Sequence, residues 1–65
     1  MTLYTMDNCP KCKMLKQKLE DKHIKIEIIN DYDVLCEKGI ESVPVLEVNG
    51  EKMNYARANT YINNL

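Results

Sequence analysis

The chain lacks long apolar runs and an excess of charge of either sign, and each absence excludes a class of protein. Its 65 residues contain no stretch approaching the roughly 20 apolar residues that a membrane-spanning helix needs. Nine Lys and Arg residues stand against ten Asp and Glu residues, so the formal net charge is only −1. The basic surface of a nucleic-acid-binding protein is therefore missing. We expect neither a membrane span nor a nucleic-acid partner.

Cysteines are few, and the N-terminus has no signal-peptide pattern. Residues Met1–Tyr4 include no basic segment followed by a long apolar stretch. The three cysteines are Cys9, Cys12 and Cys36, whereas a secreted domain held by disulfides carries more of them, usually in even number. We expect a cytoplasmic protein, in which two close cysteines indicate redox chemistry or a metal site.

Repeats, linkers and low-complexity segments are also absent, which predicts one domain over residues 1–65. We expect this domain to act as a monomer. The first half of this domain has a strand–helix–strand pattern. Thr2–Thr5 is a short strand candidate, and Pro10 suits the first position of a helix that should run to about Lys22. Polar and apolar side chains alternate over His23–Ile28, which predicts a strand with one buried face.

The second half predicts a short helix, a hairpin and a last helix. Asn30 is expected to cap the short helix, with Asp31 and Asp33 in its first turn and Gly39 at its end. The remaining expected elements are a strand over Val43–Val48, a type I′ turn at Asn49-Gly50, a strand over Glu51–Met53, and a helix capped by Asn54 with Tyr55, Ala58, Ile62 and Leu65 at helical spacing.

This order of elements, βαβαββα, predicts an α/β fold. The opening βαβ unit implies two parallel strands joined by a right-handed crossover. The hairpin adds two strands antiparallel to them. We therefore expect one four-stranded mixed sheet with flanking helices.

The segment Cys9-Pro10-Lys11-Cys12 is the strongest functional signal. The attacking species in disulfide exchange is the thiolate, and Cys9 precedes a helix whose unpaired N–H groups and dipole favour negative charge. Lys11 and Lys13 add positive charge nearby, which Asp7 partly opposes. Cys12, one turn further on, is placed to resolve a mixed disulfide formed at Cys9. These residues predict a redox-active dithiol.

The alternative for two cysteines at this spacing is half of a zinc site. A structural zinc ion takes four ligands, and only Cys36 and His23 remain to complete the set. His23 follows the far end of a helix about 18 Å long, so it should not reach Cys9. A cysteine pair that follows a strand and opens a helix in a βαβ unit favours redox chemistry. We expect no metal site.

Two segments of the chain resemble glutaredoxins. Thr2–Thr5 followed by Asn8–Lys13 is similar to their first strand and CPYC active site, and Ser42-Val43-Pro44 is similar to their Thr-Val-Pro motif. The resemblance covers nearly the whole chain. It implies a minimal thioredoxin fold with sheet order 2-1-3-4 and a cis Val43–Pro44 peptide beside the cysteines. It also implies that the backbone of Val43 pairs with an extended substrate chain.

The residues that bind glutathione in this family are altered. Met6 stands where the family carries a lysine, Lys11 replaces a tyrosine, and Asn54-Tyr55 stands where the family has Gly-Gly. The chain is also similar to the glutaredoxin-like electron donors of ribonucleotide reductase, which lack that site and are reduced by thioredoxin reductase. Arg57 falls where those proteins carry an arginine near the start of the last helix.

We therefore expect a thiol–disulfide oxidoreductase that reduces disulfide-containing proteins, ribonucleotide reductase being one candidate. It should bind no cofactor and accept electrons from thioredoxin reductase with NADPH, a flavoprotein system, rather than from glutathione. The alternatives are a carrier of a metal or a [2Fe–2S] cluster that uses Cys9, and a non-catalytic adaptor.

Cys36 is expected to be a buried apolar residue, and Tyr55 to be a groove wall or a core residue. The expected substrate-binding residues are Lys11, Lys13, Val43, Pro44, Tyr55 and Arg57.

Overall fold

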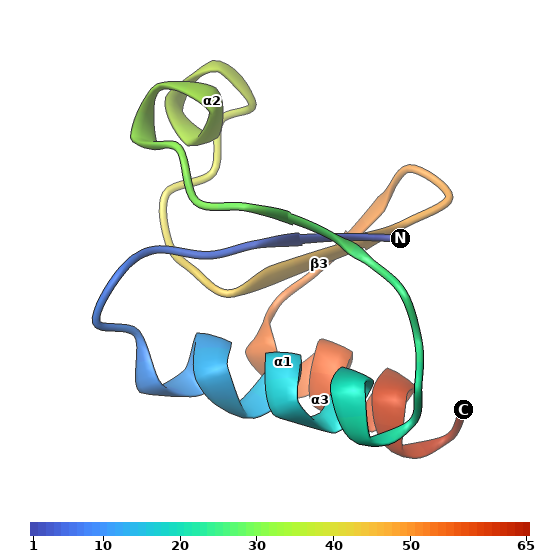
Figure 1. Cartoon of the computed structure of the whole chain (residues 1–65). Helices are drawn as coiled ribbons and strands as arrows, with labels where there is room; N and C mark the ends of the chain where they lie inside the picture. Colours follow the sequence, from blue (N-terminus) through green and yellow to red (C-terminus); the bar gives the residue numbers. More distant parts are fainter.

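One mixed sheet lies between helices in the computed structural model, which describes residues 1–65 (Figure 1). The helices α1 and α3 lie together on one side of the sheet, and α2 lies on the other. The strand order is β2-β1-β3-β4, with β1 parallel to β2 and antiparallel to β3, and with β3 antiparallel to β4. The elements are β1 (Thr2–Tyr4), α1 (Pro10–Asp21), β2 (Glu27–Ile29), α2 (Tyr32–Glu37), β3 (Val45–Val48), β4 (Glu51–Met53) and α3 (Tyr55–Asn63).

This arrangement is a minimal thioredoxin fold, as predicted. None of its three helices is both long enough and apolar enough to cross a membrane.

The core lies between the sheet and the pair α1 and α3. Leu3 sits at the centre of the sheet, opposite Ile28 on one side and Leu46 on the other. Leu15 and Leu19 of α1 are fully buried because they recur on one face of the helix. Each such buried leucine contributes about 1.5–3 kcal/mol through the apolar surface it removes from water. The buried cluster consists of Leu3, Leu15, Leu19, Leu46, Met53, Ala58 and Ile62.

Local signals determine the hairpin and the start of the last helix. Asn49 and Gly50 have φ angles of 53° and 83°, the pair of positive values that a type I′ turn requires. Asn54 caps α3, because its side-chain oxygen accepts a hydrogen bond from the N–H of Arg57 at 2.9 Å. Both predictions are confirmed.

The strand predicted over His23–Ile28 is observed only over Glu27–Ile29, and its expected buried face is only partly formed: Ile24 and Ile26 pack, partly buried, against the core cluster. After α1 the chain turns through His23, whose φ is 58°, and the N–H of Ile24 bonds to the carbonyl of Leu19. The next residues carry the chain up from the helix to the sheet, so strand pairing begins only at Glu27. Ile28 remains 41% exposed because no helix covers it fully.

Three smaller expectations are wrong. Asp31, not Asn30, caps α2 by accepting a hydrogen bond from the N–H of Asp33 at 2.9 Å, while the side chain of Asn30 donates to Asp7. Cys36 is exposed rather than buried, because the six residues of α2 bury only Leu35. Leu65 lies beyond the end of α3 and is exposed.

Candidate active site

The two cysteines of the motif form a disulfide at the start of α1. Cys9 is the N-cap of the helix and is half-buried, whereas Cys12 is only 4% exposed. The Cα atoms of the two residues are 5.2 Å apart, within the usual range for a disulfide. The N–H of Cys12 donates to the Sγ of Cys9 at 3.2 Å. The motif therefore presents one accessible sulfur and one covered sulfur.

The helix end around Cys9 favours negative charge. Pro10 occupies the first helical position, and the first turn of α1 contains no acidic residue to oppose the positive end of the helix dipole. The side chains of Lys11 and Lys13 are exposed in the same turn. Free helix N–H groups and nearby ammonium groups lower the pKa of a cysteine thiol. A reduced Cys9 in this place is suited to act as the thiolate.

A shallow pocket lies beside the cysteine pair on the side of β3 and α3. It is lined by Lys11 from α1, by Val43 and the buried Pro44 before β3, and by Tyr55 at the start of α3. The Val43–Pro44 peptide bond is cis, as predicted. Lys11 is the only charged residue that lines this pocket. We call the pocket lined by Lys11, Val43, Pro44 and Tyr55 the Pro44 groove.

Tyr55 is both a wall of the groove and a neighbour of the core, the two positions considered for it from the sequence. Its ring lines the Pro44 groove and also packs, partly buried, against the core cluster. The ammonium group of Lys11 lies over this ring, and the tyrosine hydroxyl approaches the Sδ of Met14 at 3.9 Å. Met14 was not among the residues singled out from the sequence. Its position three residues after Lys11 places the two side chains on one helix face, and that spacing is the signal that could have identified it.

A second pocket lies on the other side of the motif. Its lining includes Met6 and Asp7 from the loop after β1, together with Cys12, Lys13 and Lys16 of α1. Lys11 and Lys13 therefore line different pockets, one on each side of the cysteine pair. Asp7 is held in this second pocket by the side-chain amide of Asn30, 3.2 Å away.

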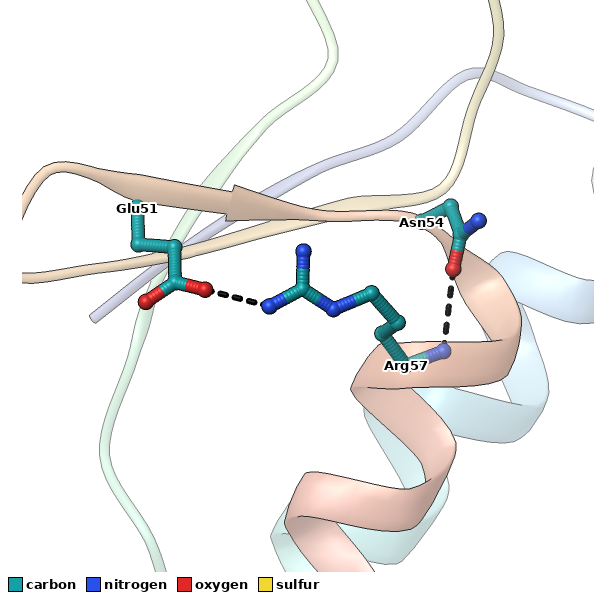
Figure 2. Close-up of polar contacts among 3 residues, drawn as sticks. All are labelled: Glu51, Asn54 and Arg57. Carbon is teal, nitrogen blue, oxygen red and sulfur yellow. Dashed lines mark hydrogen bonds and ion pairs between the residues drawn. The ribbon is translucent and has the colours of Figure 1, made fainter.

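Arg57 does not line the Pro44 groove. Figure 2 shows its side chain extending from the first turn of α3 toward the beginning of β4, where its guanidinium group pairs with the carboxylate of Glu51. The two side chains are 59% and 62% exposed, so this ion pair contributes little to stability. In the structure Arg57 connects the last helix to the hairpin.

Nothing in the structure gathers three or more His, Cys, Asp or Glu side chains closely enough to share a metal ion. Cys36, the third cysteine, is carried by α2. The chemistry that the cysteine pair offers is the interconversion of a dithiol and a disulfide.

A thioredoxin fold with a cysteine pair at this spacing is typical of thiol–disulfide oxidoreductases. Comparison with models of protein families gives a match to Glutaredoxin over residues 1–53. Comparison with curated proteins and with solved structures gives no match. Because the family model covers most of the chain, the chain belongs to the glutaredoxin family.

Proposed function

We propose that this protein is a dithiol reductant of protein disulfides, with Cys9 as the nucleophile and Cys12 as the resolving cysteine. The observation that carries this proposal is the unequal exposure of the pair: Cys9 is half-buried at the helix end, and Cys12 is 4% exposed one turn further in. A substrate disulfide therefore meets Cys9 more readily than Cys12.

The reaction proceeds by two exchange steps. The thiolate of Cys9 attacks one sulfur of the substrate disulfide; a new S–S bond forms, and the other substrate sulfur leaves as a thiolate that takes up a proton. Cys12, having lost its proton, then attacks the Cys9 sulfur of this mixed disulfide and releases the second substrate thiol. The substrate gains two electrons and two protons, and Cys9 and Cys12 become the disulfide described above.

The Pro44 groove supplies a place for the substrate chain. An extended segment can bond to the backbone of Val43, in the manner of an added strand. Lys11 is the only charge that such a segment meets in the groove. Because an ammonium group attracts a carboxylate, the groove favours substrates with Asp or Glu beside the reactive cysteine. Lys13 lies on the opposite side of the motif and supports the same preference.

A separate reductant must return the disulfide to the dithiol. Tyr55 fills the part of the groove where glutathione-using relatives carry glycine, and the pocket offers Lys11 as its only charged contact for the tripeptide. This favours a flavoprotein such as thioredoxin reductase, which draws electrons from NADPH, as the reductant. Ribonucleotide reductase, a cytoplasmic enzyme with a redox-active disulfide, is one substrate of the proposed type.

The proposal is tested with the two serine variants and a peptide disulfide. Cys12→Ser should accumulate a covalent complex with the peptide, visible by mass spectrometry and released by dithiothreitol. Cys9→Ser should form no complex, because the remaining Cys12 thiol is covered. Equal trapping by both variants would contradict the assigned roles. Both variants are compared in a Cys36→Ser background, so that the exposed third thiol cannot react.

A further inference from the structure

The outer edge of β2 has no neighbouring strand, because β2 is the first strand in the order β2-β1-β3-β4. On its inner side the N–H of Glu27 bonds to the carbonyl of Met1, and the carbonyl of Ile29 accepts from the N–H of Thr5. Backbone groups of successive strand residues point to opposite sides. The N–H and C=O of Ile28 therefore point outward. Ile26 lies just before β2, and when it continues the strand its N–H and C=O point outward as well.

Isoleucine recurs at every second position along this edge. Ile24, Ile26 and Ile28 line one groove whose other lining residues are Lys16, Leu19 and Glu20 of α1 and Lys25. Lys25 and Glu27, the residues between them, are exposed. The edge therefore combines free backbone groups with an apolar row whose end, Ile28, is 41% exposed. An edge with these properties is a template for pairing with another strand.

The charges of the segment Ile24–Ile28 are complementary to those of a second, antiparallel copy of the same segment. When two copies of Ile24–Ile28 lie antiparallel about a two-fold axis at Ile26, Ile24 lies opposite the partner's Ile28. In the same register Lys25 lies opposite the partner's Glu27, and this pair occurs twice because the arrangement is symmetric. Opposite charges across a strand pair are favourable, and like charges are not. Moving the axis by one residue, to position 27, would place Glu27 directly opposite the partner's Glu27.

We propose that two copies of this chain associate through their β2 edges, antiparallel and centred on Ile26, so that the two four-stranded sheets continue into each other. The outward N–H and C=O of Ile26 bond to the same groups of the partner. The N–H of Ile28 bonds to the carbonyl of the partner's Ile24. The N–H of Ile24 makes no bond across the interface, because it already donates to the carbonyl of Leu19. The isoleucines of the two copies meet across the new strand pair, and one Lys–Glu pair forms on each side of Ile26.

This inference differs from the monomer expected from the sequence. The alternation over His23–Ile28 is visible in the sequence and there indicates a strand with one buried face. The sheet order implied by the family resemblance already places this strand at an edge, and the structure adds that part of its apolar row is uncovered.

The test is sedimentation velocity from micromolar to millimolar concentration, in a Cys36→Ser background that excludes intermolecular disulfides. The parent should move from monomer to dimer as concentration rises. Lys25→Glu places a Glu opposite a Glu in both cross-strand pairs. Glu27→Lys places a Lys opposite a Lys in both pairs. Each variant alone should dimerise at least about tenfold more weakly than the parent.

An equimolar mixture of the two variants provides the decisive arm. In the mixed dimer every Glu faces a Lys, so the mixture should recover the parent's association while each component alone dimerises at least about tenfold more weakly. Amide exchange at Ile28 should also slow with concentration in the parent. Lys22→Glu, an equal change of charge at the end of α1, is the control and should leave association unchanged. A parent that stays monomeric at millimolar concentration, or single variants that dimerise as the parent does, would overturn the proposal.

Discussion

The ammonium group of Lys11 lies 5.2 Å from the centroid of the Tyr55 ring. A contact of this kind at an exposed site contributes about 0.5–1 kcal/mol. Lys11 belongs to α1 and lies between the two cysteines, whereas Tyr55 is the first residue of α3. A side chain of α3 therefore orients a charged side chain of α1. The charge at the mouth of the Pro44 groove is therefore held in place rather than free in solvent.

The preference for acidic substrates should depend on this charge. With peptide disulfides that differ only in having Asp or Lys beside the cysteine, the parent should reduce the acidic peptide about fivefold faster, because an exposed ion pair contributes up to about 1 kcal/mol. Lys11→Glu should reverse the order. Added salt should weaken the preference in both proteins.

Lys22→Glu makes the same change of charge at the far end of α1 and serves as the control. It should keep the preference of the parent. If Lys11→Glu reduces both peptides at the parent's rates, the groove does not select by charge, although the dithiol chemistry would stand.

Tyr55→Gly should make the protein a better acceptor of electrons from glutathione. The substitution removes the ring from the Pro44 groove and lets a peptide backbone approach. In paired NADPH-oxidation assays, the parent should turn over with thioredoxin reductase and slowly with glutathione and its reductase. The variant should gain in the glutathione assay.

Tyr55→Ala is the matched control for the loss of the contact with Lys11. It removes the ring but keeps a Cβ atom, so it should gain less than glycine does. Efficient turnover of the parent with glutathione, and none with thioredoxin reductase, would reverse the proposed choice of reductant.

Reduced Cys9 should be alkylated faster than the other two thiols in mildly acidic solution. Cys9 lies at the N-terminal end of α1, where helix N–H groups stabilise the thiolate, whereas Cys36 is more exposed to reagent but lies in the last turn of α2. A pKa lowered by one unit gives about tenfold more thiolate below neutral pH. Mass mapping after brief iodoacetamide treatment measures the order, and faster labelling of Cys36 would count against the helix-end argument.

The stability of the fold should fall in alkaline solution through Tyr4. Burial of the ring, the hydrogen bond from its hydroxyl to Glu47 at 2.9 Å and the charge of that carboxylate raise the pKa of Tyr4. The folded protein thus holds this proton more tightly than the unfolded chain. The resulting stabilisation is complete below the unfolded pKa of about 10 and is lost as pH rises through the folded value.

Tyr4→Phe isolates this contribution. It should cost about 0.5–1.5 kcal/mol of unfolding free energy at neutral pH, because Glu47 loses its donor. It should also flatten the alkaline fall relative to the parent in urea unfolding of the oxidised protein. Tyr61→Phe removes a hydroxyl elsewhere and should keep the parent's profile. An alkaline fall that persists unchanged in Tyr4→Phe would assign it to other groups.

Elements whose signals are local were predictable from the sequence. The Asn49-Gly50 turn and the Asn54 cap depend on the preferences of a few adjacent residues, and both occur where expected. The start of β2 was not predictable, because His23 adopts a left-handed conformation that the end of α1 imposes. The cap of α2 was missed by one residue, since Asn30 and Asp31 are both good capping residues and only the contact with Asp7 separates them.

The features of the candidate site also fall into those that the sequence predicted and those that it did not. The cysteine pair and the proline were recognisable because their motifs are short and specific, and the structure places Pro44 in one pocket with Lys11, the residue between the cysteines. The contact of Tyr55 with Met14 and the pairing of Arg57 with Glu51 depend on how α3 packs against α1 and the hairpin. Such packing is fixed by the whole core. The spacing of Lys11 and Met14 indicates that they share a helix face, but it does not indicate that Tyr55 packs there.

The parts of the site are unequally distributed along the chain. Both sulfurs belong to the first turn of α1, whereas the wall facing them is assembled from the segment before β3 and the start of α3. A short peptide containing only the first helix could still open and close its disulfide. On the proposed function, choosing a partner needs the intact fold, whereas exchange between the two cysteines needs only one short segment. We therefore expect a partly unfolded copy to exchange disulfides without the selectivity of the folded protein.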